Sequence, residues 1–303
     1  MLTKISDIEK RLSGRKKKAM LVAAAVSDEN IIQAIMKARD KDIINATLIG
    51  NEEKIREYCQ DNNLDQKGIY FINEEDGHKA GFKAVQLVHE EKADIIMNGQ
   101  ETYRGASFIG RAVIDKTYGI SKGNRISHLA LCEIEGYHKL IGITDIVMNN
   151  MPSLKEKALI ISNAVSFLRI LGIEKPKVAA LAAVEVVNEA MPATLEAAML
   201  SKMSQRGQIK NCIIEGPLAF DNAISKEQAT CKGIINEVSG DPDILFAPDI
   251  ETAGMLYQAF VFFAKAKVAS LAIGATVPIV LTTKMDSPET RVNSILLGAS
   301  LYV

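Results

Sequence analysis

The sequence predicts an α/β protein built on a doubly wound parallel sheet. Short, continuous apolar runs alternate along the chain with segments that repeat apolar residues at helical spacing. Uninterrupted apolar runs are typical of strands buried on both faces, and a strand–helix–strand succession places such strands in one sheet. The chain has 303 residues, which is enough for one large domain or two medium ones.

The first half of the chain shows this alternation most clearly. Residues 19–25 form an apolar run, and Asp28 is placed to cap a helix that we expect to reach Arg39. The elements that follow are expected to be strand, helix, strand, helix and strand, at residues 46–50, 52–59, 69–72, 77–90 and 95–97. Ligands of such sheets bind beyond the carboxyl ends of the strands. Asn98 and Gly99 follow one such strand and are therefore candidate binding residues.

The middle of the chain predicts a change in topology. Residues 127–134 and 140–144 flank a polar segment and predict a hairpin, which is followed by a long helix at residues 153–171. Thr144 and Asp145 come directly after the second hairpin strand, where a ligand is expected. The remaining elements are predicted as strands at 178–184, 212–215, 244–247, 268–273 and 279–281, and helices at 193–206 and 254–264.

Composition excludes several classes of function. The formal net charge is −1, so no global field attracts nucleic acid or an anionic membrane. No apolar run is long enough for a transmembrane helix. The four cysteines lie far apart and show no metal-binding spacing with histidine, so we expect reduced thiols, no metal site and a cytoplasmic location.

The segment at residues 278–290 predicts an anion site. A short apolar strand leads into a polar loop, after which Ser287 is a favoured helix cap and Pro288 suits the first helical position. The loop therefore brings the Thr283 hydroxyl, the Lys284 ammonium, the Asp286 carboxylate and free backbone N–H groups towards one point. Such an arrangement suits a phosphate group.

Ordered sequence blocks resemble the phosphate acetyl/butyryl transferase family, and in particular its butyryltransferase branch. They include Ala-Val-Glu-Val-Val-Asn at 183–188, Met-Pro-Ala-Thr at 191–194 and Glu-Gly-Pro-Leu-Ala-Phe-Asp-Asn-Ala at 215–223. Further blocks lie at residues 176–179, 202–209, 232–234, 240–245 and 274–287. The resemblance covers nearly the whole chain and is densest from about Thr144 onward.

The resemblance implies a fold like that of isocitrate and isopropylmalate dehydrogenases, with two three-layer α/β domains and the active site in a cleft between them. We expect residues 1–145 together with 278–303 to form the first domain, residues 146–277 to form the second, and two chains to form a homodimer. The family transfers a short-chain acyl group, here expected to be butyryl, between coenzyme A and inorganic phosphate. Coenzyme A is a substrate, and no cofactor is implied.

The family's chemistry assigns roles to the loop residues. Thr283 and Lys284 stand where the family has a Ser-Arg pair, and we expect them to hold the phosphate and the developing oxyanion, with Asp286 as base or orienting carboxylate. Lysine keeps the charge of arginine but loses its bidentate geometry. The further candidate substrate-binding residues are Asn98, Gly99, Arg111, Ser127, Thr144, Asp145, Asp221, Asn222, Gly274, Ala275 and Ser287.

Structural roles compete with several of these assignments. Arg111 could equally be a solvated charge, and Asp221 and Asn222 could simply cap a helix. Ser127 and His128 precede a strand, where a satisfied buried histidine is the commoner case.

Two other functions compete with active transfer. The sequence departs from the family at 283–284, at 253–254 (Ala-Gly for Gly-Asn) and in the longer 100–110 stretch. The main alternative is therefore a catalytically altered, coenzyme A-binding relative with a binding or regulatory role. A dehydrogenase of the isocitrate type is disfavoured, because neither a metal-binding aspartate cluster nor a dinucleotide fingerprint can be picked out.

Overall fold

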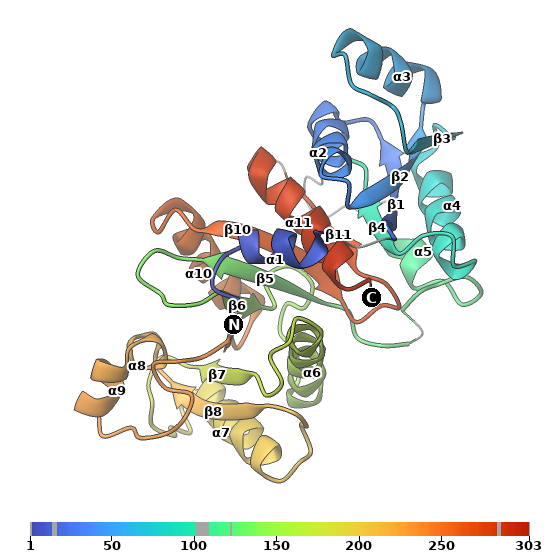
Figure 1. Ribbon diagram of the computed structural model, residues 1–303. Helices are drawn as coiled ribbons and strands as arrows, with labels where there is room; N and C mark the ends of the chain where they lie inside the picture. Colours follow the sequence, from blue (N-terminus) through green and yellow to red (C-terminus); the bar gives the residue numbers. More distant parts are fainter. Residues whose placement is uncertain (1, 14–16, 101–108, 122, 284–285, 303) are drawn as a thin grey trace. The chain divides into compact units, whose positions relative to one another are not determined.

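The protein divides into two compact units. The structure, a computed structural model, describes residues 2–13, 17–100, 109–121, 123–283 and 286–302. Unit 1 comprises residues 1–5 and 125–268, and unit 2 comprises residues 6–124 and 269–303 (Figure 1). The units therefore change at 124/125 and 268/269, whereas the sequence predicted changes at 145/146 and 277/278. The earlier changes follow from strand pairing, because residues 127–133 and 141–144 form one hairpin.

Unit 2 is a doubly wound α/β unit. Its elements in chain order are α1 (Ser6–Leu12), β1 (Ala19–Val26), α2 (Glu29–Asp40), β2 (Ile44–Gly50), α3 (Glu52–Asp61), β3 (Ile69–Asn73), α4 (Gly77–His89), β4 (Ile95–Asn98), α5 (Gly110–Val113), β10 (Lys267–Ile273), β11 (Ile279–Val280) and α11 (Pro288–Ser300). The strand order is β3-β2-β1-β4-β11-β10. The first five strands are parallel, and β10 runs antiparallel to β11.

The winding reverses between β1 and β4. The chain moves outward from β1 to β2 and β3, then returns through α4 to β4 on the other side of β1. Because parallel crossovers are right-handed, α4 lies on the face of the sheet opposite α2. The predicted doubly wound parallel sheet is therefore confirmed, and β1 and β4 flank its switch point, where ligands of this fold bind.

Side chains at the helix starts explain where these helices begin. Asp28 accepts a hydrogen bond from the backbone N–H of Asn30 at 2.9 Å, and so caps α2 as predicted. Asn51 and Asp76 cap α3 and α4 in the same way. All three caps follow the carboxyl ends of parallel strands, so three helix N-termini face one edge of the sheet.

Unit 1 carries the predicted hairpin followed by parallel strands. Its elements are β5 (Ser127–Glu133), β6 (Ile141–Thr144), α6 (Leu154–Ile170), β7 (Lys177–Leu181), α7 (Pro192–Gln205), β8 (Ile213–Leu218), α8 (Phe220–Ile224), α9 (Lys226–Cys231), β9 (Ile244–Phe246) and α10 (Ile250–Phe262). The strand order is β5-β6-β9-β7-β8, antiparallel only between β5 and β6. The helix α7 packs on β7 and β8 (Figure 1).

Two predicted boundaries in unit 1 differ from the structure. β7 ends at Leu181 instead of residue 184. The backbone N–H of Ala182 donates to the Leu218 carbonyl at the end of β8, and the chain then leaves the sheet. α10 begins at Ile250, four residues before the expected 254, because Asp249 accepts from the backbone N–H of Thr252 and caps it. Within the described ranges, no helix is long and apolar enough to cross a membrane.

Candidate active site

The carboxyl ends of β4 and β11 form one part of the site in unit 2. These strands are parallel neighbours, and Val280 pairs with Met97. Asn98 and Gly99 after β4 therefore lie at the same sheet edge as Thr283 after β11. Sequence reasoning selected these residues from separate segments, and the register brings them together.

Gly99 locks the ends of β1 and β4 together. Its backbone N–H donates to the Ala24 carbonyl at 2.6 Å. A Cβ at this position would lie 2.6 Å from the same oxygen and 2.6 Å from Cγ2 of Val26. Only glycine allows this close approach of the two backbones beside the switch point.

The loop between β11 and α11 folds around Asp286. Its Oδ2 accepts a hydrogen bond from the backbone N–H of Thr283 at 2.7 Å, and its own N–H donates to the Thr283 carbonyl at 3.1 Å. Ser287 accepts from the N–H of Thr290 at 3.0 Å, so it is the predicted cap of α11. Lys284 lies outside the described residues.

Arg291 is a site residue that sequence reasoning missed. Its side chain is only 4% exposed, and its Nη2 donates to the Thr283 carbonyl at 3.3 Å. The signal for it was its spacing: it follows the helix cap Ser287 by four residues, so both lie on one face of α11. The Arg291 guanidinium is therefore a buried positive charge that contacts the loop through the Thr283 carbonyl.

The environment of Asp286 suits a general base. Burial raises the pKa of its carboxyl above the usual 3.8, and the hydrogen bond from Thr283 and the charge of Arg291 only partly oppose this effect. A carboxylate with a raised pKa accepts a proton more readily near neutral pH.

Three other candidates in unit 2 stand apart from this loop or are exposed. β10 runs antiparallel to β11, so Gly274 and Ala275 after β10 lie at the opposite sheet edge from Thr283. The structure therefore does not bring them to the predicted anion site. Arg111 lies on α5 with an exposed side chain.

In unit 1 the predicted residues Ser127, Thr144 and Asp145 come together at the open end of the hairpin. Thr144 Oγ1 donates to the His128 carbonyl at 2.9 Å, and Ser127 Oγ accepts from Asn163 on α6 at 3.0 Å. Asp145 accepts from the backbone N–H groups of residues 147 and 148 and from the Asn149 amide, so it orders the loop after β6.

His128 is a buried neutral histidine. Burial lowers its pKa to about 4, with a partial opposing effect from the Asp145 carboxylate. The imidazole is therefore uncharged at neutral pH.

Asp221 and Asn222 join two residues that sequence reasoning missed. The Asn222 amide donates to Glu185 at 3.2 Å, and the Lys232 ammonium pairs with Glu185 at 3.1 Å and with Asp221 at 3.0 Å. Glu185 follows β7 and Asp221 follows β8, so this cluster also lies at a carboxyl edge of parallel strands. The sequence feature that could have indicated this cluster is the position of Glu185 just after a buried strand.

Potential metal ligands do not gather anywhere in the described residues. No group of three or more His, Cys, Asp or Glu side chains there is placed to hold an ion. Both units instead present hydroxyl, amide and charged groups on loops after parallel strands. Fold and site together define an α/β enzyme for small anionic substrates.

Comparison with known proteins identifies the class further. The chain belongs to the phosphate acetyl/butaryl transferase family, whose pattern matches residues 75–299. It is 40% identical over 299 residues to a phosphate butyryltransferase of Clostridium acetobutylicum, covering 99% of this chain and 98% of that one. It is also 40% identical over 285 residues to a phosphate acetyltransferase of Thermotoga maritima, covering 94% and 96%. The protein is therefore a phosphate acyltransferase.

Solved structures agree with the fold. A branched-chain phosphotransacylase from Enterococcus faecalis is similar with a TM-score of 0.82 and 25% identity, covering 93% of this chain and 98% of that one. A putative 4-hydroxythreonine-4-phosphate dehydrogenase from Salmonella typhimurium has a TM-score of 0.56 at 12% identity, over 94% of this chain and all of that one. The second likeness shows the fold alone, and it supports the predicted likeness to the isocitrate dehydrogenase type.

Proposed function

We propose that this acyltransferase moves a short-chain acyl group, butyryl in preference to acetyl, between coenzyme A and inorganic phosphate. The blocks at residues 183–223 resemble the butyryltransferase branch, and this resemblance supports the acyl preference. The observation that carries the site assignment is the half-buried Asp286 beside Thr283 and Arg291, with its raised pKa.

The chemistry requires a base because a thiol pKa of about 8.5 leaves most of coenzyme A protonated at neutral pH. In the direction of acyl-CoA synthesis, Asp286 takes the thiol proton, and the sulfur forms a bond to the carbonyl carbon of the acyl phosphate. The tetrahedral oxyanion then collapses, the bond from carbon to the phosphate oxygen breaks, and phosphate leaves with the electron pair. The proton held by Asp286 passes to the leaving phosphate.

The charge that develops in this reaction calls for fixed donors. The Thr283 hydroxyl and the Lys284 ammonium would hold the phosphate and the oxyanion, and Arg291 would fix the loop from behind. Asn98, Gly99 and Ser287 would contact the same anion. Candidates for the coenzyme A contacts in unit 1 are Ser127, Thr144, Asp145, Asp221 and Asn222.

Phosphate-dependent release of free thiol tests the acyl preference. We would measure it with acetyl-, propionyl-, butyryl- and isobutyryl-CoA on the purified protein. The proposal predicts the highest kcat/KM for a four-carbon thioester. Each methylene added up to that length should raise kcat/KM by about 10- to 200-fold. Highest activity on acetyl-CoA would overturn the butyryl preference. Thiol release independent of phosphate would overturn the transfer reaction itself.

A further inference from the structure

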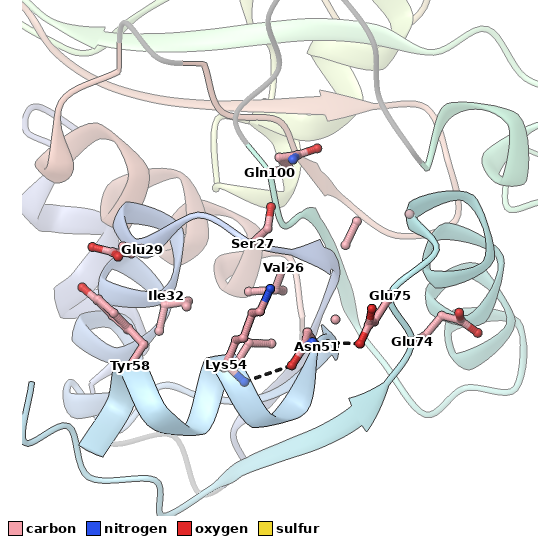
Figure 2. Close-up of a pocket in the computed structure, with 14 residues that line it drawn as sticks. Val26, Ser27, Glu29, Ile32, Asn51, Lys54, Tyr58, Glu74, Glu75 and Gln100 are labelled. Atoms are coloured by element: carbon pink, nitrogen blue, oxygen red, sulfur yellow. Dashed lines mark hydrogen bonds between the residues drawn. The ribbon is translucent and has the colours of Figure 1, made fainter. Parts of the chain in front are cut away.

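Unit 2 contains an open pocket that none of the residues assigned to acyl transfer lines. Its volume is about 480 Å³, within the range of small-molecule sites. It opens at the carboxyl ends of β1, β2 and β3, where the residues after these strands line it (Figure 2). Neither Thr283 nor Asp286 is among the lining residues.

The pocket has an apolar floor with one aromatic ring. Val26, Ile32 and Ile55 contribute the floor, and Tyr58 stands at one side with its hydroxyl bonded to the Gln33 amide at 2.7 Å. The Tyr58 ring is thereby held in place beside the cavity. A flat, weakly polar ring of a ligand would bury apolar area on these groups.

Two of the charged side chains around the floor, Glu74 and Glu75, have partners in the protein. Glu74 is neutralised by Lys83 at 2.8 Å, and Glu75 accepts from the Asn51 amide at 2.8 Å (Figure 2). In the described parts of the chain, no ion pair or hydrogen bond engages the Lys54 ammonium or the Glu29 carboxylate. The pocket thus offers one cation for an anionic group and carboxylates that can accept from hydroxyl groups.

The position of Lys54 favours phosphate. It lies in the first turn of the ten-residue helix α3, and Asn51 caps this turn by accepting from the Lys54 backbone N–H at 3.0 Å. The positive end of the helix dipole adds to the ammonium charge at the same place. The side chain points into the cavity beneath Val26 (Figure 2).

The backbone beside the pocket is specialised as well. Ala25 adopts a left-handed conformation with φ of 59°, and the pairing of β1 with β2 shifts register between Ala24 and Val26. A Cβ at Gly50 would lie 2.4 Å from the Val26 carbonyl, so the two strand ends approach closely. Strained residues and bulges concentrate at binding sites, where they redirect side chains.

We propose that this pocket binds a nucleoside phosphate. The phosphate lies on Lys54 at the start of α3, the ribose hydroxyls donate to Glu29 and Glu75, and the base covers the apolar floor beside Tyr58. This inference goes beyond acyl transfer. Two sources supply the same chemistry, a free nucleotide or the nucleotide end of coenzyme A, and experiment can distinguish them.

Calorimetric titration with AMP, adenosine and coenzyme A tests the proposal without turnover. Lys54→Ala removes the cation from the exposed surface of α3, and Lys79→Ala, an exposed lysine in the first turn of α4 outside the pocket, is the matched control. We expect Lys54→Ala to weaken binding of the phosphorylated ligand about tenfold, and Lys79→Ala to leave it unchanged. Adenosine, which lacks the phosphate, should bind both variants equally.

The two sources give different patterns, and each supports the proposal. If coenzyme A is the source, AMP competes with it and its KM rises about tenfold in Lys54→Ala. If a free nucleotide is the source, AMP affinity falls while the KM for coenzyme A stays unchanged. The proposal is overturned if neither AMP nor coenzyme A binding depends on Lys54. Thiol release by the wild type, measured separately, distinguishes that failure from failure of the proposed reaction.

Discussion

At the scale of single residues, we propose that the protonation of Asp286 governs the reaction. Burial raises the pKa of Asp286, whereas the charge of Arg291 lowers it. Turnover needs the deprotonated carboxylate, so it falls as the pH drops through this pKa. Because the pKa is raised, this acid limb lies at higher pH than it would for an aspartate with the usual pKa.

Removing the Arg291 charge should move the acid limb further. Arg291→Met keeps much of the buried volume but removes the cation, so the pKa of Asp286 rises and the limb of the kcat/KM profile shifts to higher pH. Arg291→Lys retains the charge and should shift the limb less. A Met variant that folds normally and shows the wild-type limb would contradict this coupling.

The residues of the loop were only partly predictable. Ser287, Thr283 and Asp286 follow from local rules, because a helix cap after a strand fixes which groups face the anion site. Arg291 did not follow from those rules, since its role depends on which face of α11 turns back towards the loop. The separation of Gly274 from Thr283 could not be predicted either, because the antiparallel direction of β10 cannot be read from its apolar run.

At the scale of elements, a buried ion pair anchors the β5–β6 hairpin. The Lys139 ammonium, at the hairpin loop, lies 2.7 Å from Asp243, and both side chains are more than 90% buried. Asp243 also accepts from the backbone N–H of Lys177 at 2.7 Å, so it ties the hairpin to the starts of β9 and β7.

Breaking this pair should destabilise the protein strongly. Asp243→Ala removes one of the two carboxylates that pair with the buried Lys139 ammonium, the other being Asp241, and leaves the backbone N–H of Lys177 without its acceptor. The loss of these buried contacts costs about 1–3 kcal/mol. The measurement is the midpoint of thermal or urea unfolding. Glu9→Ala, which removes the partly exposed partner of Lys41 on α1, is the control and should change stability little. Equal midpoints for both variants would exclude the anchoring role.

Most elements followed from apolar periodicity, because buried parallel strands and amphipathic helices have distinct patterns. The short helices α8 and α9 were not assigned ranges, since a helix of one or two turns has too few residues for a period to emerge. The boundaries of β7 and α10 moved because hydrogen bonds at their ends, from Ala182 and to Asp249, decide where they stop and start.

At the scale of the whole molecule, α10 offers a surface for the expected homodimer. Phe260 is buried in the core of unit 1, whereas Met255 is 68% exposed and Phe263, directly after the last residue of α10, is 89% exposed. Exposed apolar side chains gathered on one helix are typical of association surfaces. We propose that two copies of the chain pair through this helix.

A charge on this surface should dissociate the dimer. We expect Phe263→Asp to lower the mass measured by light scattering from that of two chains to that of one. Tyr70→Asp, at an exposed aromatic residue of β3 in unit 2, is the control and should leave the mass unchanged. A wild type that is already monomeric, or a Phe263→Asp protein that stays dimeric, would exclude pairing through α10.

The fold class was predictable from the alternation of strands and helices, and the family from ordered blocks of sequence. The division into units was harder to predict, because β5 and β6 join unit 1 through pairing with β9, a contact across about a hundred residues of chain. Acyl-chain preference depends on the packing around the substrate, and sequence periodicity carries no information about it.

The central claim is that Asp286 is the base of a phosphate acyltransferase. The most direct test is the kcat of phosphate-dependent thiol release from butyryl-CoA by Asp286→Asn. Glu289→Gln, which neutralises an exposed carboxylate in the first turn of α11, is the matched control. We predict that Asp286→Asn lowers kcat about 100-fold or more and that Glu289→Gln leaves it near the wild-type value. Wild-type turnover by a folded Asp286→Asn protein would contradict the claim.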